Sequence, residues 1–376
     1  MIYRELGNTG IEISIVGFGG MRFFTSDEAT AFATVKRCID KGINFFETGS
    51  YGEGKSEVVL GQALKAATTR DQVVIANKAA AASLPTGDDV RRSLEASLER
   101  EQVDYFDLFS FWGTNTPEIF ENVMKPGGPL DVVEKAKEEG LVRAIGLTTH
   151  ARQEWILDFA HKHHWDAITL KEHMLYSRQQ EVINTLGEMG TGVIIMSPLA
   201  GGVICTPSQE IVDELAKAGM AAPVLGLRYL VSNPNVTTAI SGMTRPEDVD
   251  ENVKAGETGA PLSETEQRLV QFILDKTTAL DEKFCTACGY CMPCEQEVNI
   301  PGIFRLWNLM RGYGSADYSK LEYQKVREQR HWADFLGKSA EECIECGQCE
   351  DKCPESLPII EDLKRAHADL TKDWED

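Results

Sequence analysis

The chain has 376 residues, of which 42% are hydrophobic and 26% are charged. This balance is that of a globular protein and excludes a disordered or a fibrous chain. The length suits one large domain joined to a small module. No segment approaches the roughly 18 apolar residues of a membrane span. Residues 1–6 lack the build of a signal peptide, so the sequence predicts a cytoplasmic protein.

The formal net charge is −21. A surface this acidic repels the phosphates of nucleic acids and anionic lipid headgroups. We therefore expect neither a nucleic acid nor a membrane as a partner. The charge favours solubility, and it would also suit docking to a basic partner.

Short apolar segments alternate with helical patterns throughout residues 1–262. Eight such strand–helix repeats predict an α/β fold, a (β/α)8 TIM barrel. A doubly wound sheet is the alternative, but no G-x-G-x-x-G motif follows a strand. The predicted strands are 11–18, 43–46, 73–76, 105–111, 144–147, 167–170, 192–196 and 237–240, and helical stretches between them include 27–41, 88–101 and 130–139.

In a TIM barrel the functional residues lie at the carboxyl ends of the strands. We therefore expect the residues that follow the predicted strands to gather at one end of the barrel. In chain order they are Glu47 and Tyr51, Lys78, Trp112, Thr148 to His150, Glu172 and His173, Ser197 to Leu199, and Gly242 to Arg245.

The cysteines are distributed unevenly. Of ten, Cys38 and Cys205 stand alone and are interpreted as structural, and the other eight fall between Cys285 and Cys353. This shift predicts a barrel at 1–262, a connecting helix at 263–280 and a cysteine-rich domain at 281–376. A reducing cytoplasm disfavours disulfides, so we expect the eight thiols to serve metal or redox chemistry.

The eight cysteines form two runs of four, and the second run has the spacing and trailing proline of bacterial ferredoxins. In two-cluster ferredoxins the fourth cysteine of a run binds the other cluster. Zinc is the competing interpretation, but four cysteines in one tight run are unusual for zinc. We predict two [4Fe–4S] clusters, one held by Cys285, Cys288, Cys291 and Cys353, and the other by Cys343, Cys346, Cys349 and Cys294.

The runs are separated by residues 295–342, a longer segment than a compact ferredoxin needs. Helical patterns cover 303–310 and 318–336 within it. The sequence therefore predicts a mainly α-helical two-cluster ferredoxin-like domain.

The order of several short motifs in the barrel resembles that of the aldo/keto reductases, and the cysteine runs resemble those of a subgroup with a ferredoxin-like tail. The resemblance implies an oxidoreductase that transfers hydride between a nicotinamide and a carbonyl of a small-molecule substrate. It rests on Gly17–Met21, Asn44–Thr48 with Tyr51, Lys78, Asp104–Leu108, Arg143–Leu147, Ser197–Leu199 and the segment 233–252.

In that family a tyrosine donates the proton, a lysine lowers its pKa, an aspartate orients the lysine and a histidine positions the substrate. The resemblance implies that Tyr51 is the acid and Lys78 its partner. Glu47 replaces the aspartate. Trp112 replaces the histidine, and an indole can neither accept a hydrogen bond nor take up a proton. His150 and His173 are candidates for a displaced acid.

The resemblance also implies a nicotinamide site. Asp248 stands where relatives place an arginine for the 2′-phosphate, which favours NADH over NADPH, although Arg245 is near. The implied cofactor-binding residues are Gly19, Met21, Thr148, Thr149, Ser197, Pro198, Leu199, Gly201, Gly242, Met243, Thr244, Arg245, Asp248 and Asn252.

Hydride carries two electrons, whereas a [4Fe–4S] cluster exchanges one at a time, and a flavin can convert between them. Three arrangements remain open: nicotinamide chemistry with clusters that are structural or serve another partner, a flavin relay in the barrel, and direct reduction by the clusters. A ferredoxin-type protein is the expected electron partner. A redox-responsive nicotinamide-binding protein without turnover is the alternative from another class.

Overall fold

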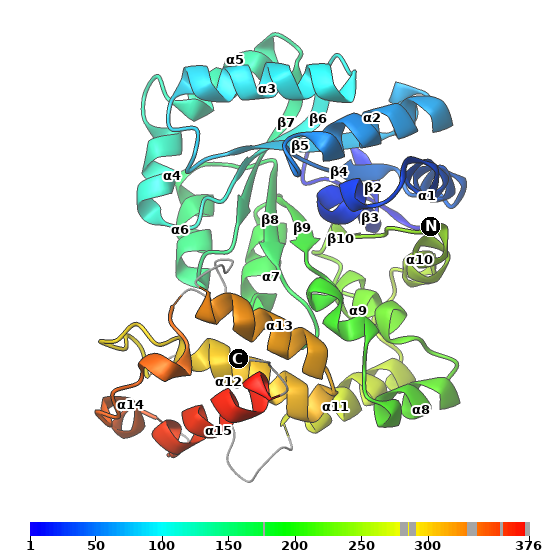
Figure 1. Cartoon of the computed structure of the whole chain (residues 1–376). Helices are drawn as coiled ribbons and strands as arrows, with labels where there is room; N and C mark the ends of the chain where they lie inside the picture. The colour runs from blue at the N-terminus through cyan, green and yellow to red at the C-terminus, as the bar shows by residue number, and fades with distance from the viewer. Residues whose placement is uncertain (176, 279–284, 286–290, 329–336, 354–355, 373–376) are drawn as a thin grey trace. The chain divides into compact units, whose positions relative to one another are not determined.

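The computed structural model describes residues 1–175, 177–278, 285, 291–328, 337–353 and 356–372. The chain forms two compact units (Figure 1). The first contains Met1–Gly201 and Pro223–Leu262, and the second contains Gly202–Ala222 and Ser263–Asp376. No motif in the sequence set Gly202–Ala222 apart from the rest of the barrel region.

The first unit is built on a closed barrel of parallel strands in the order β10-β3-β4-β5-β6-β7-β8-β9. This confirms the predicted (β/α)8 barrel. The strands are β3 (Val16–Gly19), β4 (Phe45–Glu47), β5 (Val74–Ala80), β6 (Phe106–Trp112), β7 (Val142–Thr149), β8 (Ala167–Lys171), β9 (Gly192–Met196) and β10 (Thr238–Ser241).

A short hairpin closes the amino-terminal end of the barrel. β1 (Tyr3–Glu5) pairs antiparallel with β2 (Glu12–Ser14). Ile13 of β2 and the neighbouring residues Leu6 and Ile11 are buried in one core cluster with residues at the beginnings of the barrel strands, such as Phe45 and Val74. The predicted single strand 11–18 is therefore two strands, because the chain leaves the hairpin at Ser14 and joins the barrel at Val16.

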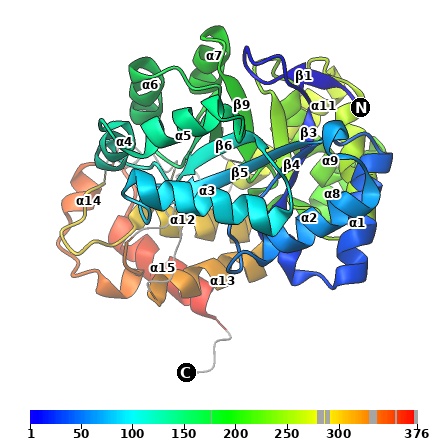
Figure 2. The same ribbon diagram turned by 90° about the horizontal axis from the view of Figure 1, so that it is seen from above.

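Helices alternate with the barrel strands, and α1, α2 and α3 lie side by side along one flank (Figure 2). Side-chain caps begin several of them: Asp27 accepts from the Thr30 amide at 3.0 Å, and Thr86 accepts from the Asp89 amide at 3.2 Å. The helices are α1 (Glu28–Asp40), α2 (Lys55–Ala67), α3 (Gly87–Glu101), α4 (Pro117–Met124), α5 (Pro129–Glu138), α6 (Gln153–Lys162), α7 (Gln180–Glu188), α9 (Ala222–Val231) and α10 (Pro246–Asn252).

The second unit is mainly helical, as predicted. Its core joins α12, α13 and α15 through buried side chains that include Phe304, Trp307, Tyr323 and Leu363. The predicted helix 303–310 is α12 followed by a π-helical turn at Leu309–Tyr313, and the end of the predicted helix 318–336 lies outside the described residues. The helices are α8 (Gln209–Lys217), α11 (Glu264–Thr278), α12 (Ile300–Asn308), α13 (Ala316–Arg327), α14 (Gln348–Asp351) and α15 (Ile359–Thr371).

Candidate functional site

Three neighbouring barrel strands bring four of the predicted catalytic residues together. β4 ends at Glu47, β5 carries Lys78 and β6 ends at Trp112. The carboxylate of Glu47 contacts the ammonium of Lys78, and both side chains are buried. The Lys78 Nζ lies 5.0 Å from the centroid of the Tyr51 ring. Tyr51 in turn meets Trp112 edge to face, with ring centroids 5.7 Å apart.

The loop that carries Tyr51 is held by a buried chain of hydroxyl groups. The Thr48 and Ser56 hydroxyl oxygens are 2.7 Å apart, and the Ser56 hydroxyl donates to the Gly20 carbonyl at 2.8 Å. The Thr48 amide donates to the Ala76 carbonyl at 3.0 Å, so the loop begins against β5. Nothing in the sequence marks these residues, because small hydroxyl side chains in a loop form no distinctive pattern.

Gly49 gives the Lys78 side chain its space. A Cβ atom at position 49 would lie 3.1 Å from Lys78 Cε and 3.2 Å from Lys78 Cγ. Any larger residue would therefore press on the lysine. The signal for this in the sequence is a glycine two residues before Tyr51, within the short segment 47–51.

Burial and pairing act on Lys78 in opposite directions. Burial alone lowers the pKa of Lys78 to about 7. The Glu47 carboxylate in contact with it favours the charged ammonium and raises the Lys78 pKa again. Burial raises the pKa of the Tyr51 phenol, so that side chain holds its proton at neutral pH.

The two histidine candidates follow other strands. The His150 amide donates to the Asn115 side-chain oxygen at 2.8 Å, directly after β7. His173 is fully buried after β8, beside Glu172. The Glu172 carboxylate accepts from the Gln179 amide at 2.9 Å and from the Arg178 amide at 3.2 Å, which fixes the loop after β8. Burial raises the pKa of Glu172.

Several predicted cofactor-binding residues use their side chains for internal contacts. The Thr149 hydroxyl donates to the Thr114 carbonyl at 2.6 Å, and the Asn252 amide group donates to the Ser241 hydroxyl at 2.8 Å. Met243 and Thr148 are buried, whereas Met21 is exposed. At the ends of β3 and β10, a Cβ on Gly242 would lie 3.8 Å from the Gly19 carbonyl oxygen. The contacts of Thr149 and Asn252 hold these strand ends in place.

The loop after β9 has an unusual backbone. Ser197 has φ 53° and Ala200 has φ 52°, the left-handed region that non-glycine residues rarely adopt, and Gly201 follows with φ 69°. Pro198 is buried and Leu199 is half-buried. Strained backbone of this kind concentrates at functional sites, and Ser197, Pro198, Leu199 and Gly201 are among the cofactor-binding residues that the resemblance implies.

At the start of α10, Asp248 caps the helix. Its carboxylate accepts from the Thr244 amide at 3.0 Å and the Arg245 amide at 3.1 Å. It also pairs with the Arg245 guanidinium at 2.9 Å. These hydrogen bonds and this ion pair hold the pKa of Asp248 below its ordinary value, against the effect of burial. Two amides that a phosphate could use are therefore already bonded to a carboxylate.

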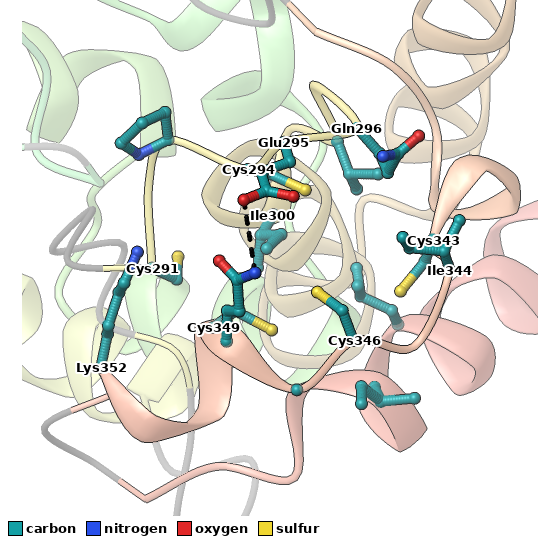
Figure 3. Close-up of a pocket in the computed structure, with 16 residues that line it drawn as sticks. Cys291, Cys294, Glu295, Gln296, Ile300, Cys343, Ile344, Cys346, Cys349 and Lys352 are labelled. Atoms are coloured by element: carbon teal, nitrogen blue, oxygen red, sulfur yellow. Dashed lines mark hydrogen bonds between the residues drawn. The ribbon is translucent and has the colours of Figure 1, made fainter.

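A second candidate site lies among the cysteines. Cys291, Cys294, Cys343, Cys346 and Cys349 line one cavity. Figure 3 shows the sulfurs of Cys294, Cys343, Cys346 and Cys349 directed toward a common space, whereas the Cys291 side chain is drawn to one side of them. These four are the residues predicted to bind one cluster.

The two cysteine runs are joined by contacts around this cavity. Val298 forms a bridge with Lys338, and the Gln348 side chain donates to Glu295 at 3.4 Å. The Tyr323 hydroxyl accepts from the Ala340 amide at 3.1 Å, which fixes the loop before Cys343. The first run is thereby brought against the second.

Of the other predicted ligand set, Cys288 lies outside the described residues. Cys285 and Cys353 are partly buried against the same core as Cys291. The Asn308 side chain donates to the Cys285 carbonyl at 3.0 Å and ties this cysteine to α12.

The barrel matches the model of the aldo/keto reductase family over residues 15–274. The chain belongs to this family. Residues 284–357 of this aldo/keto reductase also match a 4Fe-4S dicluster domain. Both assignments agree with the resemblance seen in the sequence.

The relatives are oxidoreductases. L-galactose dehydrogenase from Arabidopsis thaliana is 31% identical over 280 residues, 67% of this chain and 87% of its own length. 6-Dehydroglucose reductase from Novosphingobium aromaticivorans is 26% identical over 67% of this chain and 90% of its own. An aldo-keto reductase from Bacillus halodurans in its holo form has a TM-score of 0.61 at 25% identity, covering 72% of this chain and 96% of its own. A thermostable aldo-keto reductase solved with the inhibitor epalrestat has the same TM-score at 27% identity, covering 72% and 99%.

The thiols of this aldo/keto reductase suit iron–sulfur clusters. Among the described residues, no three His, Cys, Asp or Glu side chains are close enough to hold a single metal ion. Five thiols nevertheless line one cavity, whose other walls include the apolar Val298, Ile300 and Leu363. A cubane binds one thiolate at each of its four irons. Its four thiolates therefore stand farther apart than the four ligands of a single tetrahedral zinc ion. No helix in the described part of the chain is long and apolar enough to cross a membrane.

Proposed function

We propose that this aldo/keto reductase oxidises or reduces a carbonyl-type substrate in its barrel with nicotinamide, and exchanges electrons with a partner through two [4Fe–4S] clusters. The observation that carries the barrel part is the buried contact between Glu47 and Lys78 beside the Tyr51 ring. A buried ion pair next to a phenol at the carboxyl ends of barrel strands is an arrangement suited to proton transfer.

The chain's own residues would manage the proton. Nicotinamide, when bound, gives or takes an electron pair as hydride, and each cluster carries one electron. In reduction, the Tyr51 phenol gives its proton to the carbonyl oxygen, which becomes the alcohol. The Lys78 ammonium stabilises the phenolate left behind, and Glu47 keeps Lys78 charged. Trp112 excludes water from this proton path without taking part in it.

We propose a sugar-like substrate, with a ring that carries several hydroxyl groups. Two relatives are named for such compounds, L-galactose and 6-dehydroglucose. Trp112 and Tyr51 supply aromatic surface beside the reacting groups. An aromatic face suits the apolar face of a sugar ring.

We also propose that NADH is preferred to NADPH. The Asp248 carboxylate repels a 2′-phosphate, and its ion pair occupies Arg245. The amides at the start of α10 are bonded to the same carboxylate. A ribose hydroxyl is better accommodated there than a second phosphate.

The replacement of a histidine by Trp112 favours a second candidate, in which flavin or the clusters supply electrons to the barrel without nicotinamide. A ferredoxin-type protein would then feed the clusters. An anaerobic visible spectrum of the purified protein, before and after NADH, separates these schemes. Bleaching by NADH, and less by NADPH, supports the first proposal. Bleaching by a low-potential reductant alone overturns the coupling of nicotinamide to the clusters.

A redox-responsive nicotinamide-binding protein without turnover is distinguished by Lys78→Met. If the protein is an enzyme, this variant should still bind NADH but should no longer turn over sugar aldehydes or lactols. If the unaltered protein turns over none of a panel of such substrates yet still binds NADH, the binding protein is the better description.

A further inference from the structure

Behind Lys78, on the side of β5 that faces α2 and α3, lies a second group of buried polar residues. Glu57, Asn77 and Glu101 are each 2% exposed or less. The Asn77 side-chain nitrogen donates to Glu57 at 3.0 Å and to Glu101 at 2.7 Å. No sequence motif marks these three residues.

This network is bonded directly to the backbone of Lys78. β4 ends at Glu47, opposite Ala76, so it does not extend alongside Lys78. The Lys78 amide donates instead to the Asn77 side-chain oxygen at 2.6 Å. The Asn77 amide group therefore donates to both carboxyl groups, and its oxygen accepts from the backbone of β5.

The two carboxyl groups have different surroundings. Glu57 lies in the first turn of α2, where the helix dipole favours negative charge, and it pairs with Arg100 Nε at 2.5 Å. Glu101 is the last residue of α3, where the dipole disfavours negative charge. Its second oxygen, Oε2, is buried without a hydrogen-bond partner among the described residues.

The two helices that carry these carboxyl groups pack closely together. A Cβ on Gly61 of α2 would lie 2.2 Å from the Glu101 carbonyl oxygen, so the two helices are in close contact at this point. The charged groups that act on Glu101 are Glu57 from α2, Arg100 from α3 and Arg70 from the turn before β5. Burial and the neighbouring Glu57 raise the pKa of Glu101 well above its ordinary value.

We propose that Glu101 is a protonated carboxylic acid in the folded protein and that, with ionised Glu57, it holds Asn77 and thereby positions Lys78. The single ion pair to Arg100 assigns the negative charge to Glu57. A neutral acid at Glu101 removes the repulsion between two buried carboxylates. The positioning part of this inference rests on the proposed role of Lys78, whereas the protonation of Glu101 does not.

The matched variants Glu57→Gln and Glu101→Gln test the protonation. The folded state keeps a proton on Glu101 that the unfolded state releases, so the contribution of Glu101 to stability falls as pH rises above about 4.5, its ordinary value. Glu101→Gln should therefore raise the urea midpoint at pH 8 and lose that advantage near pH 5. Glu57→Gln should lower the midpoint at pH 8, because Arg100 loses its partner. Equal losses in both variants at pH 8 would overturn the proposal.

The positioning role has its own readout, which needs neither cofactor nor substrate. The Lys78 ammonium is titrated by NMR in protein labelled with 13C at lysine Cε, with the signal assigned through Lys78→Met. Asn77→Ala should lower the titration midpoint of Lys78, because the strand loosens and the contact with Glu47 weakens. Glu101→Gln should leave it unchanged.

Asp107→Asn is the control. Asp107 is as buried as Glu101 and pairs with Arg70. Its carboxylate, however, accepts from the Ile75 amide near the beginning of β5, away from Lys78. It should lower stability without moving the Lys78 midpoint. An Asn77→Ala protein that folds and titrates like the unaltered protein would refute the positioning role. These outcomes are independent of whether turnover is found.

Discussion

Glu47 contacts Lys78 although the family residue at its position is an aspartate, one methylene shorter. The longer side chain therefore preserves the ion pair, and both partners are only 7% exposed. Two charges buried this deeply depend on each other, because either one alone would be left unpaired in an apolar setting.

Glu47→Gln should lower the free energy of unfolding by about 3–5 kcal/mol, the cost of leaving a buried charge without its partner. With only burial acting, the pKa of Lys78 should fall to about 7, below the value of 10.5 for an unburied lysine. Between these values the unfolded chain binds the proton and the folded one does not, so the variant's stability should rise with pH in this window. Urea unfolding at pH 6, 8 and 10 measures this.

Glu47→Asp is the control for that experiment, since it keeps the carboxylate. It should retain most of the stability and show no such rise with pH. A Glu47→Gln protein whose stability does not change between pH 7 and 10 would show that Lys78 has another source of charge compensation.

Gly49→Ala should reduce turnover by about tenfold to a hundredfold, the range expected when a catalytic group is displaced by a fraction of an ångström to 1 Å. The new methyl group would press on Lys78 Cε and Cγ, so kcat should fall more than the affinity for NADH. Ser50→Ala, a change at the exposed neighbouring residue, should have little effect. Equal kcat values in the two variants would mean that Lys78 tolerates displacement.

Asp248→Ala should change cofactor preference and stability together. Loss of the capping-box carboxylate at the third residue of α10 should cost about 1 kcal/mol of stability. Removal of the carboxylate also releases Arg245, so the ratio of the NADPH and NADH dissociation constants should fall. Fluorescence titration with both nucleotides measures it. Glu247→Ala is the control: it removes one charge beside the cap and should change neither stability nor the ratio much. An unchanged ratio in Asp248→Ala would show that Asp248 does not determine cofactor preference.

Cysteine variants test which thiols share a cluster. Cys294→Ser and Cys349→Ser should lose the same EPR signal of the reduced protein, because both sulfurs face one cavity. Cys291→Ser should lose the other signal. Each variant should retain about four of about eight iron atoms per chain if the second cluster survives. Loss of a common signal in Cys291→Ser and Cys294→Ser would reverse the assignment of the fourth ligands.

The sequence predicted the barrel well because parallel strands buried on both faces form continuous apolar segments, such as 192–196. It missed the β1–β2 hairpin, since Tyr3–Glu5 has no apolar alternation. The eight cysteines also predicted the iron–sulfur domain well, because the spacing of the thiols is typical of loops that bind such clusters.

The candidate site was only partly predictable. Motif order identified Glu47, Tyr51 and Lys78, but nothing in the sequence relates Asn77 to Glu57 and Glu101. Those contacts depend on how two helices pack on one strand. Asn252 and Thr149 lie at the predicted positions, yet their side chains bond to Ser241 and Thr114. A motif gives the position of a residue, whereas its direction depends on neighbours that come from other parts of the chain.

The segment Gly202–Ala222 limits how the cysteine-rich unit could be exchanged between proteins. α8 in this segment pairs with α11 through Glu210 with Lys276 at 2.6 Å and Glu214 with Arg268 at 2.9 Å. The Ser208 amide also donates to the Tyr313 carbonyl at 2.9 Å. A gene fragment ending at Leu262 would encode α8 without these helices. Recombination at the end of the barrel region therefore could not transfer the cysteine-rich unit intact. A successful transfer would have to include Gly202–Ala222 as well.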